Sequence, residues 1–368
     1  MAKQLSLNGL EIKGFRPFAR LELPKLSRVN LIVGKNSVGK TSLLDAVQLF
    51  AQQGSPISIR DLLLNRDEVA GEPGDENTAC IAIESLFYGR PELVTNSTEF
   101  SIASLGHGAI SMKVSYQRFV EQYEFKEGSG KICRIAEETI ETVEGSIPGL
   151  RIKFGNREQR VPFEYLSRGP RFTNRLFDPI LSCRYVPANG LSADEIARIW
   201  DSIALKEEEA IVYDAIKLVS NNIERLVFVA DSRSRQSRIA MVKFSDHRKP
   251  APLRSLGEGT NHLFGLAVSL IAARDGILLV DEIENGLHYS VMTRMWKLII
   301  EQCNKLNVQI IAATHSLDCI KGFQAATAEL NATEALLIRL EGKDGNIKGV
   351  TFNPSELAIA IDGDIEFR

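Results

Sequence analysis

The stretch GKNSVGKT, from Gly34 to Thr41, fits the pattern Gly-x-x-x-x-Gly-Lys-Ser/Thr, which cradles phosphate groups. Glycines let the backbone curl so that its N–H groups point at phosphate oxygens, and a following helix adds the positive end of its dipole. Lys40 is placed to reach the β- and γ-phosphates, and the Thr41 hydroxyl to bind magnesium. The spacing therefore predicts a site for ATP and Mg²⁺. The predicted nucleotide contacts are Gly34, Lys35, Asn36, Ser37, Val38, Gly39, Lys40, Thr41 and Ser42.

The residues on either side supply the elements that must hold such a loop. Val29 to Val33 is a short apolar run, which predicts a strand that leads directly into Gly34. After Lys40, apolar residues recur at helical spacing and predict a helix with one buried face; they are Leu43, Leu44, Val47, Phe50 and Ala51. A chance glycine turn is the competing interpretation, but strand, loop and helix stand in the order that phosphate binding needs.

A second motif, GILLVDEIENGLH, carries the carboxylates that hydrolysis needs in addition. Ile277 to Val280 is continuously apolar, as in a strand buried on both faces. The run ends in Asp281 and Glu282, and adjacent side chains at a strand end point in different directions. We expect Asp281 to hold Mg²⁺ and Glu282 to polarise the attacking water. An exposed acidic strand end is the alternative interpretation.

A third apolar run, Val308 to Ala313, also predicts a buried strand, and it closes on Thr314, His315 and Ser316. A lone histidine is usually structural or merely exposed. The carboxyl ends of parallel strands, however, are where such sheets bind ligands. We therefore expect His315 to donate a hydrogen bond to the γ-phosphate and to sense its loss.

Between the first and second motifs lies SLGEGTNHL, a glycine-bearing turn ahead of a predicted helix from Thr260 to Ala273. The order of phosphate loop, SLGEG turn, acidic strand end and histidine resembles the ATP-binding-cassette (ABC) ATPase superfamily. In that superfamily two heads sandwich two nucleotides, and the signature turn of one head touches the γ-phosphate held by the other. The resemblance implies that Ser255, Gly257, Glu258 and Gly259 act in trans. A helix cap by Ser255 or Thr260 is the alternative, but it leaves the glycines unexplained.

Further details are similar to the branch that contains RecF, the structural-maintenance-of-chromosomes (SMC) heads and the OLD (overcoming lysogenisation defect) proteins. LEIKGFRPFARLELP resembles their opening strands, and NPSELAIAIDGDIEFR resembles their C-terminal helix. DEIENGLH resembles their acidic motif, in which Glu284 to Leu287 would correspond to the dimer-contacting loop. Many relatives carry a toprim nuclease domain after the ATPase, whereas this sequence ends soon after His315. The resemblance therefore implies that an effector, if needed, is a separate polypeptide.

Two features depart from that branch. The superfamily usually has a glutamine after the strand that joins the core to the helical lobe, but Cys183–Val186 leads here into PANG, where Asn189 is the candidate replacement. SMC heads also carry long heptad repeats, and this sequence shows none. The best helical stretch, Ser192 to Leu226, opens with a capping box of Ser192 and Glu195 and predicts a two-helix arm that carries the signature.

The motifs predict an α/β fold of the P-loop class: a mostly parallel core sheet that holds the phosphate loop, Asp281 and His315, flanked by an antiparallel β lobe and a helical signature lobe. The β-prone runs of the insertion are Cys80–Tyr88, Glu99–Ser104, Ala109–Tyr116 and Leu150–Phe154. We expect one ABC-type ATPase domain over residues 1–368, with an N-terminal core lobe at 1–90, a β-rich insertion at 91–180, a helical lobe with the signature turn at 181–260 and a C-terminal core at 261–368.

Composition is that of an ordinary globular protein, with a net charge of −3, so a generally basic nucleic-acid coat is excluded. Residues 121–145 are rich in glutamate, whereas 151–175 and 233–254 each carry seven basic residues. These basic stretches fit DNA or RNA phosphates, an acidic protein partner or an ordinary solvated surface.

No apolar run is long enough for a membrane span or a signal core, and the five cysteines are scattered. A reduced cytoplasm fits best.

Together the motifs predict ATP hydrolysis by a head-to-head homodimer. The OLD resemblance favours a sensor or regulatory subunit of a bacterial anti-phage defence system, which controls a separately encoded effector such as a nuclease. The alternative is a RecF-like DNA-binding ATPase in repair or recombination.

Overall fold

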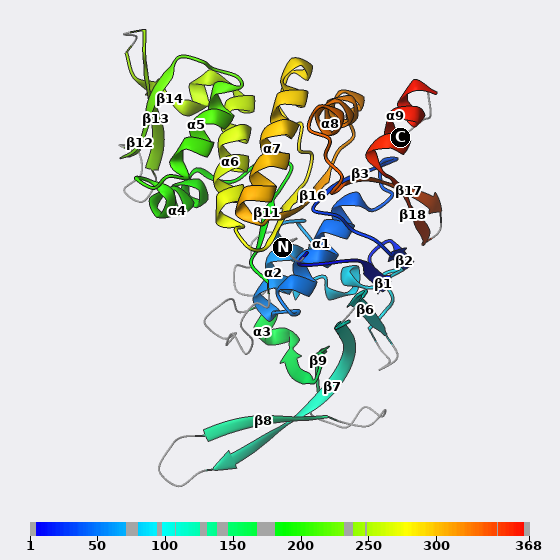
Figure 1. The fold of residues 1–368 in the computed structure, drawn as a ribbon. Coiled ribbons are helices and arrows are strands. Elements are labelled where there is room, and N and C mark those ends of the chain that lie inside the picture. The colour runs from blue at the N-terminus through cyan, green and yellow to red at the C-terminus, as the bar shows by residue number, and fades with distance from the viewer. Residues whose placement is uncertain are drawn as a thin grey trace.

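A computed structural model describes residues 5–70, 80–93, 98–106, 108–125, 131–137, 146–167, 181–231, 238–246, 249–343 and 345–363. One large mixed sheet runs through the molecule, and helices cover both faces of its central strands (Figure 1). Across these ranges, no helix is both apolar enough and long enough to cross a lipid bilayer.

The large sheet has thirteen strands. They are β1 Leu10–Phe15, β2 Phe18–Leu23, β3 Val29–Gly34, β6 Glu99–Ser104, β7 Ser111–Phe125, β8 Lys131–Glu137, β9 Ile147–Phe154, β10 Arg157–Pro162, β11 Cys183–Val186, β15 Ile277–Val280, β16 Gln309–Ala313, β17 Ala335–Lys343 and β18 Asn346–Phe352. Their order is β10-β9-β7-β6-β1-β2-β18-β17-β3-β16-β15-β11, and β8 pairs with β7.

Helices and smaller sheets surround this large sheet. The helices are α1 Lys40–Ala51, α2 Pro56–Leu64, α3 Phe163–Ser167, α4 Ala193–Ile203, α5 Glu209–Lys217, α6 Glu258–Ala272, α7 Met292–Leu306, α8 Leu317–Glu329 and α9 Pro354–Asp362. Short 3₁₀ turns lie at Ile83–Leu86, Leu253–Leu256 and Tyr289–Val291. The smaller sheets are formed by β4 Val69–Ala70 with β5 Cys80–Ile81, and by β12 Ile223–Ala230, β13 Arg238–Phe244 and β14 Ala251–Pro252.

The central strands β17, β3, β16, β15 and β11 pair in parallel with one another, as the sequence predicts. Because parallel strands end at the same edge of a sheet, this order brings the residues that follow β3, β15 and β16 together. Those residues are the phosphate loop, Asp281 and the segment that contains His315. The sheet therefore positions the motifs that are far apart in the chain.

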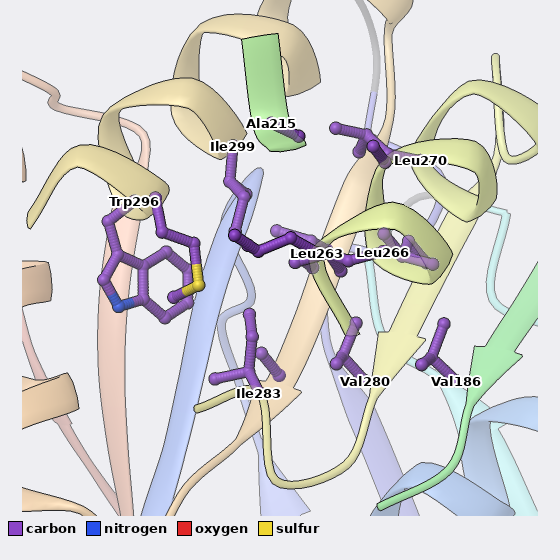
Figure 2. Close-up of a cluster of buried hydrophobic side chains, with 14 of the residues drawn as sticks. Val186, Ala215, Leu263, Leu266, Leu270, Val280, Ile283, Trp296 and Ile299 are labelled. Atoms are coloured by element: carbon purple, nitrogen blue, oxygen red, sulfur yellow. The ribbon is translucent and has the colours of Figure 1, made fainter. Parts of the chain in front are cut away.

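Side chains of these central strands alternate between two hydrophobic cores, one on each face of the sheet. Leu31 and Leu278 contribute to the core under α4 to α8, whereas Ile32 and Leu279 contribute to the core under α1 and α2. This burial on both faces explains why the strands read as continuous apolar runs. Figure 2 shows the first core, where Leu263 and Leu266 of α6 lie over Val280, and Ile283 lies beside them.

The predicted antiparallel lobe is continuous with the core sheet. Strands β10, β9, β7, β6, β1 and β2 pair antiparallel, and β2 joins the core through its parallel pairing with β18. The predicted strand Glu99–Ser104 is β6. By contrast, the predicted run Cys80–Tyr88 is mostly wrong, because only Cys80–Ile81 is a strand and Ile83–Leu86 forms a 3₁₀ turn.

The predicted two-helix arm is correct for α4 and α5 but ends earlier than expected. Its capping box is present, since the Glu195 N–H donates to Ser192 and the Ser192 N–H donates to Glu195. The helical prediction over Ile223–Leu226 is wrong, because these residues begin β12. Strand β12 pairs antiparallel with β13, so long-range pairing overrides the local helical pattern.

Candidate functional site

The phosphate loop is the turn between the buried strand β3, which ends at Gly34, and helix α1, which begins at Lys40. Gly34 and Gly39 have φ angles of 144° and 105°, in the region that favours glycine. A Cβ atom on Gly39 would lie 2.8 Å from the Phe18 ring, so close packing also requires glycine there. The loop backbone and the N-terminus of α1 therefore form a geometry suited to anions.

The loop side chains divide into exposed and buried ones. Lys35, Asn36 and Ser37 are exposed, and Val38 is buried. Lys40 is buried, and its Nζ donates to the carbonyl oxygens of Gly34 at 2.7 Å and of Lys35 at 3.0 Å. Its ammonium group therefore lies within the curl of the loop.

Burial lowers the pKa of Lys40, and the nearby carboxylates of Asp281, Glu284 and Glu282 oppose that shift. The acidic motif that follows β15 is thus close enough to act electrostatically on the phosphate-loop lysine. Two motifs that lie far apart in the chain share one electrostatic environment.

Thr41 and Asp281 make the direct contact between these motifs. The Thr41 hydroxyl donates to Asp281 Oδ2 at 2.8 Å. Asp281 is buried, and its N–H donates to the carbonyl of Val186 at 2.9 Å, which continues the pairing of β15 with β11. A hydroxyl oxygen and a carboxylate oxygen that converge at a strand end are the hard oxygen donors that suit Mg²⁺.

Glu282 lies in a strained turn directly after Asp281. Its φ angle is 46°, which is uncommon for a residue with a side chain and is found at functional positions. The carbonyl of Glu282 accepts a hydrogen bond from the Asn285 N–H at 2.8 Å, so residues 282–285 form a tight turn. The strand thus ends directly before the two predicted carboxylates, and the chain turns at Glu282.

His315 is exposed and lines the same cavity as Lys40 and Thr41. Its backbone N–H donates to Glu284 Oε1 at 3.1 Å. The segment after β16 is therefore tied to the acidic turn by Glu284, which the sequence analysis placed only in the dimer-contacting loop. The signal that could have predicted this contact is a third carboxylate three residues after Asp281.

The signature turn occupies the N-terminal end of α6. Ser255 and Glu258 are exposed, Gly259 is buried, and Gly257 has a φ angle of 104° where the helix begins. The Ser255 hydroxyl donates back to the carbonyl of Pro252 at 2.7 Å, and α6 has no side-chain cap. The alternative in which Ser255 or Thr260 caps this helix is therefore wrong.

The signature helix packs directly against the acidic turn of the same chain. A Cβ atom on Gly259 would lie 2.4 Å from the carbonyl oxygen of Gly286, so only glycine allows this approach. One turn farther along α6, the buried ring of His262 places Nε2 3.0 Å from the carbonyl oxygen of Ile283. Burial lowers the pKa of His262. Two contacts thus join α6 to the turn that contains Glu282.

A cavity of about 420 Å³ opens beside the phosphate loop. Signature residues are not among those that line it in the part of the chain that the structure describes. The lining residues are Arg16, Pro17, Ser37, Gly39, Lys40, Thr41, Ser42, Arg66, Glu68, Ser85, Phe87, Gly89, Arg90 and His315.

One wall of this cavity belongs to a network of charges that the sequence analysis missed, in which Arg16 and Asp45 are buried and Arg90 is exposed. Arg16 binds Glu68 through two hydrogen bonds of 2.8 and 3.1 Å and lies 3.6 Å from Asp45. Arg66 lies 2.5 Å from Asp45, and Arg90 lies 3.1 Å from Glu68. Asp45 was the available signal, because it is the only acidic residue of the predicted helix.

The pKa of Asp45 is raised above its ordinary value. Burial raises its pKa to about 6, although Arg66 and Arg16 act in the opposite direction. The carboxylate of Asp281 adds to the rise. The protonation state of the cavity wall is therefore coupled to the acidic motif.

The linker after β11 contains Asn189, which was the candidate replacement for the superfamily's glutamine. A different residue, Asn285, joins this linker to the acidic turn. Asn189 is exposed. Asn285, on the acidic turn, donates from Nδ2 to the carbonyl of Ala188 at 2.6 Å. The contact between linker and turn is thus made by the turn's own asparagine.

The basic stretches are described only in part. In the stretch 151–175, Arg151, Lys153 and Arg160 all lie within 3.5 Å of the Glu158 carboxylate, so part of its charge is paired internally. Other basic residues fall outside the described residues; they are Arg168, Arg171, Arg175, Arg233, Arg235 and Arg248. The side chains of the acidic stretch 121–145 all lie outside the described part of the structure.

Comparison with known families identifies both halves of the site. Residues 6–142 match the family described as "AAA ATPase domain". Residues 170–318 match the family described as "AAA domain, putative AbiEii toxin, Type IV TA system". The first match contains the phosphate loop, and the second contains the signature turn, the acidic motif and His315.

Similar proteins agree with these matches. An "ATP/GTP phosphatase" of Helicobacter pylori is 22% identical over 86% of this chain and 86% of its own length. An uncharacterised protein of Methanocaldococcus jannaschii is 31% identical over 32% of this chain and 52% of its own length. The solved structure of an SMC head bound to the C-winged helix domain of ScpA covers 94% of this chain and 97% of its own, with a TM-score of 0.52 and 16% identity. The chain is therefore an ATPase, and its α/β P-loop fold is similar to that of an SMC head.

Proposed function

We propose that two copies of this ATPase assemble head to head and hydrolyse ATP at two shared sites. The observation that supports this proposal is the position of the signature turn. Ser255 and Glu258 are exposed at the N-terminus of the long helix α6, and they are not among the described residues that line the chain's own phosphate-loop cavity. An uncapped helix N-terminus with a glycine-bearing turn suits an anion that a second copy supplies.

Within each shared site, positioning and electrostatics perform the catalysis. The phosphate-loop backbone from Gly34 to Ser42 holds the triphosphate, and Lys40 neutralises its β- and γ-phosphates. Glu282 orients the attacking water, and His315 contacts the γ-phosphate. Ser255, Gly257 and Gly259 of the second copy complete the enclosure of that phosphate.

Thr41 and Asp281 would hold Mg²⁺. Their oxygen atoms already converge at 2.8 Å, and Mg²⁺ usually takes one or two protein oxygens, with phosphate oxygens and water completing its shell. When bound, the ion neutralises charge on the phosphates that Lys40 also contacts. The donor set therefore fits this ion.

Trapping the dimer tests this assembly. The Glu282→Gln chain keeps the nucleotide contacts but loses the carboxylate that activates water, so ATP should hold two copies together. Sedimentation of Glu282→Gln with ATP should show dimers, and the same chain with ADP should sediment as monomers. Monomers in both conditions would overturn the head-to-head proposal.

For the biological role, we propose a cytoplasmic sensor subunit of a bacterial anti-phage defence system that controls a separately encoded effector. Support comes from the family over residues 170–318, whose description names a toxin and a Type IV TA system. ATP-dependent dimerisation would pass the signal to that effector. Deleting the gene from its native host should increase phage plaquing, and Lys40→Ala should have the same effect. Unchanged plaquing after deletion, across a panel of phages, would contradict this role.

The basic residues favour one alternative, a RecF-like DNA-binding ATPase. Residues 233–254 carry seven basic residues against one acidic residue. Binding to duplex DNA that requires ATP, falls with salt and weakens on charge reversal at Arg233 and Arg235 would support it. Absence of DNA binding at low salt would favour the sensor role.

A further inference from the structure

Cationic side chains surround the cavity beside the phosphate loop. In addition to Lys40, its lining contains Arg16, Arg66 and Arg90, whereas Glu68 is its one carboxylate among the residues that the structure describes. The role of Lys40 is assigned above, but the three arginines belong to segments outside the phosphate loop. An excess of positive charge in a cavity favours an anionic ligand.

The carboxylates of the cavity wall neutralise these arginines unequally. Glu68 Oε1 accepts hydrogen bonds from both Arg16 and Arg90, each at 3.1 Å, and Oε2 accepts from Arg16 and from Ser85, each at 2.8 Å. Arg90 therefore shares one oxygen with the buried Arg16, and its charge is only partly neutralised. Glu68 is the one acceptor of the Arg90 side chain within the described ranges. Because a guanidinium group carries five N–H donors, Arg90 retains donors for a ligand.

The backbone holds Arg90 at the cavity in an uncommon conformation. Its φ angle is 49°, a left-handed value that residues with a side chain rarely adopt and that is found at ligand-binding positions. The segment before it is hydrogen-bonded to the hairpin of β1 and β2. The Arg16 N–H donates to the carbonyl of Leu86 at 3.0 Å, and the Tyr88 N–H donates to the carbonyl of Gly14 at 2.8 Å. Arg90 thus begins from a position that the core sheet fixes.

The same hairpin packs against the phosphate loop. A Cβ atom on Gly39 would lie 2.8 Å from the Phe18 ring and 2.9 Å from Pro17, and Pro17, Gly39 and Ser42 all line the cavity. Backbone N–H groups of such a loop cradle the α- and β-phosphates. The hairpin therefore places the segment of Arg90 beside the part of the loop that would hold these two phosphates.

We infer that Arg90 binds the α- or β-phosphate of the nucleotide and so contributes equally to the affinity for ADP and for ATP. A nucleobase is uncharged and would not use the positive charge that Glu68 leaves unneutralised. Arg90 would complete the phosphate contacts from outside the loop, with Glu68 orienting its guanidinium group. This inference rests on the proposed function, in which the phosphate loop holds the triphosphate.

Equilibrium binding to the full chain tests this contact. The ligands are ADP and the non-hydrolysable ATP analogue AMP-PNP, each measured by isothermal titration calorimetry in the presence of Mg²⁺. Arg90→Gln removes the charge but keeps a planar group that donates hydrogen bonds, so the Kd of both ligands should rise at least about 5-fold. Arg90→Lys restores a point charge that can bind phosphate, and its Kd values should stay within about 2-fold of the wild type.

Arg20→Gln is the matched control. The Arg20 side chain is 60% exposed, compared with 68% for Arg90, and it also pairs with carboxylates, those of Glu11 and Glu22. Arg20 is not among the described residues that line the cavity. Its substitution should leave the Kd of both ligands unchanged.

Three results would overturn the inference. The first is an unchanged Kd in Arg90→Gln. The second is a failure of lysine to restore binding, which would assign Arg90 to stacking on the nucleobase. The third is weakening confined to AMP-PNP, which would move the contact to the γ-phosphate.

Lys40→Ala tests the phosphate loop separately, because it should bind neither ligand. If Lys40→Ala loses binding while Arg90→Gln keeps it, the proposed function stands and the inference about Arg90 fails. If Lys40→Ala binds both ligands as the wild type does, the proposed function fails and the inference fails with it.

Discussion

The Thr41 hydroxyl lies 2.8 Å from the Asp281 carboxylate, although 240 residues separate them in the chain. Thr41 is in the first turn of α1, and Asp281 directly follows β15. The contact joins the phosphate loop to the acidic motif. It therefore defines where a divalent ion would be held.

Removing the Thr41 hydroxyl should weaken the response to Mg²⁺. Thr41→Ala leaves Asp281 without this oxygen partner, so the Mg²⁺ concentration for half-maximal ATP hydrolysis should rise at least about 10-fold. Thr41→Ser keeps the oxygen and should stay close to the wild type. The measurement is ATPase rate against free Mg²⁺. An identical Mg²⁺ response in Thr41→Ala would remove Thr41 from the ion site.

His262 is expected to position the acidic turn, because its ring is hydrogen-bonded to the carbonyl of Ile283, one residue from Glu282. His262→Leu fills the buried position with an apolar side chain that cannot donate to that carbonyl. We expect kcat to fall about 3- to 10-fold, with little change in the KM for ATP. His262→Gln places an amide N–H near the position of Nε2 and should restore most of the rate. A fall in kcat that glutamine does not rescue, accompanied by a lower Tm, would indicate a packing role only.

Asp45 should make stability depend on pH in a defined direction. Its pKa in the folded chain is about 6, above the ordinary value of 3.8, so folding favours the protonated form. Its contribution to the free energy of unfolding is therefore fully present below pH 3.8 and falls as pH rises through 6. The measurement is the free energy of unfolding in urea for the wild type and for Asp45→Asn. Between pH 3.8 and 6, the wild type should lose stability relative to Asp45→Asn as the pH rises. A difference that stays constant from pH 4 to 7 would refute the raised pKa.

The central strands and the phosphate loop were predictable because their signals are local. β11 and β15 have the predicted bounds, and the loop between β3 and α1 follows from glycine spacing and an apolar run. The parallel order could also be expected, because continuous apolar runs indicate strands that are buried on both faces.

Other features depend on contacts between distant segments and were missed. β12 forms only because β13 pairs with it, so Ile223–Leu226 reads as helix in isolation. Asp45 and Glu68 form their ion pairs with Arg16 only because the pairing of β1 with β2 brings Arg16 between them. The contact of His262 could not be predicted, because its partner is a backbone carbonyl and no side chain in the sequence indicates it.

The central claim is that each active site is shared between two copies, and a complementation assay tests it most directly. Lys40→Ala should bind no ATP but keep an intact signature turn, whereas Ser255→Arg should bind ATP but fail to hydrolyse it. In a mixed dimer, Lys40 of one variant meets the signature turn of the other and rebuilds one site. Mixing the two inactive proteins should therefore restore about a quarter of the wild-type ATPase rate, as random pairing into two-fold dimers predicts. Wild-type turnover by Ser255→Arg alone would contradict the account.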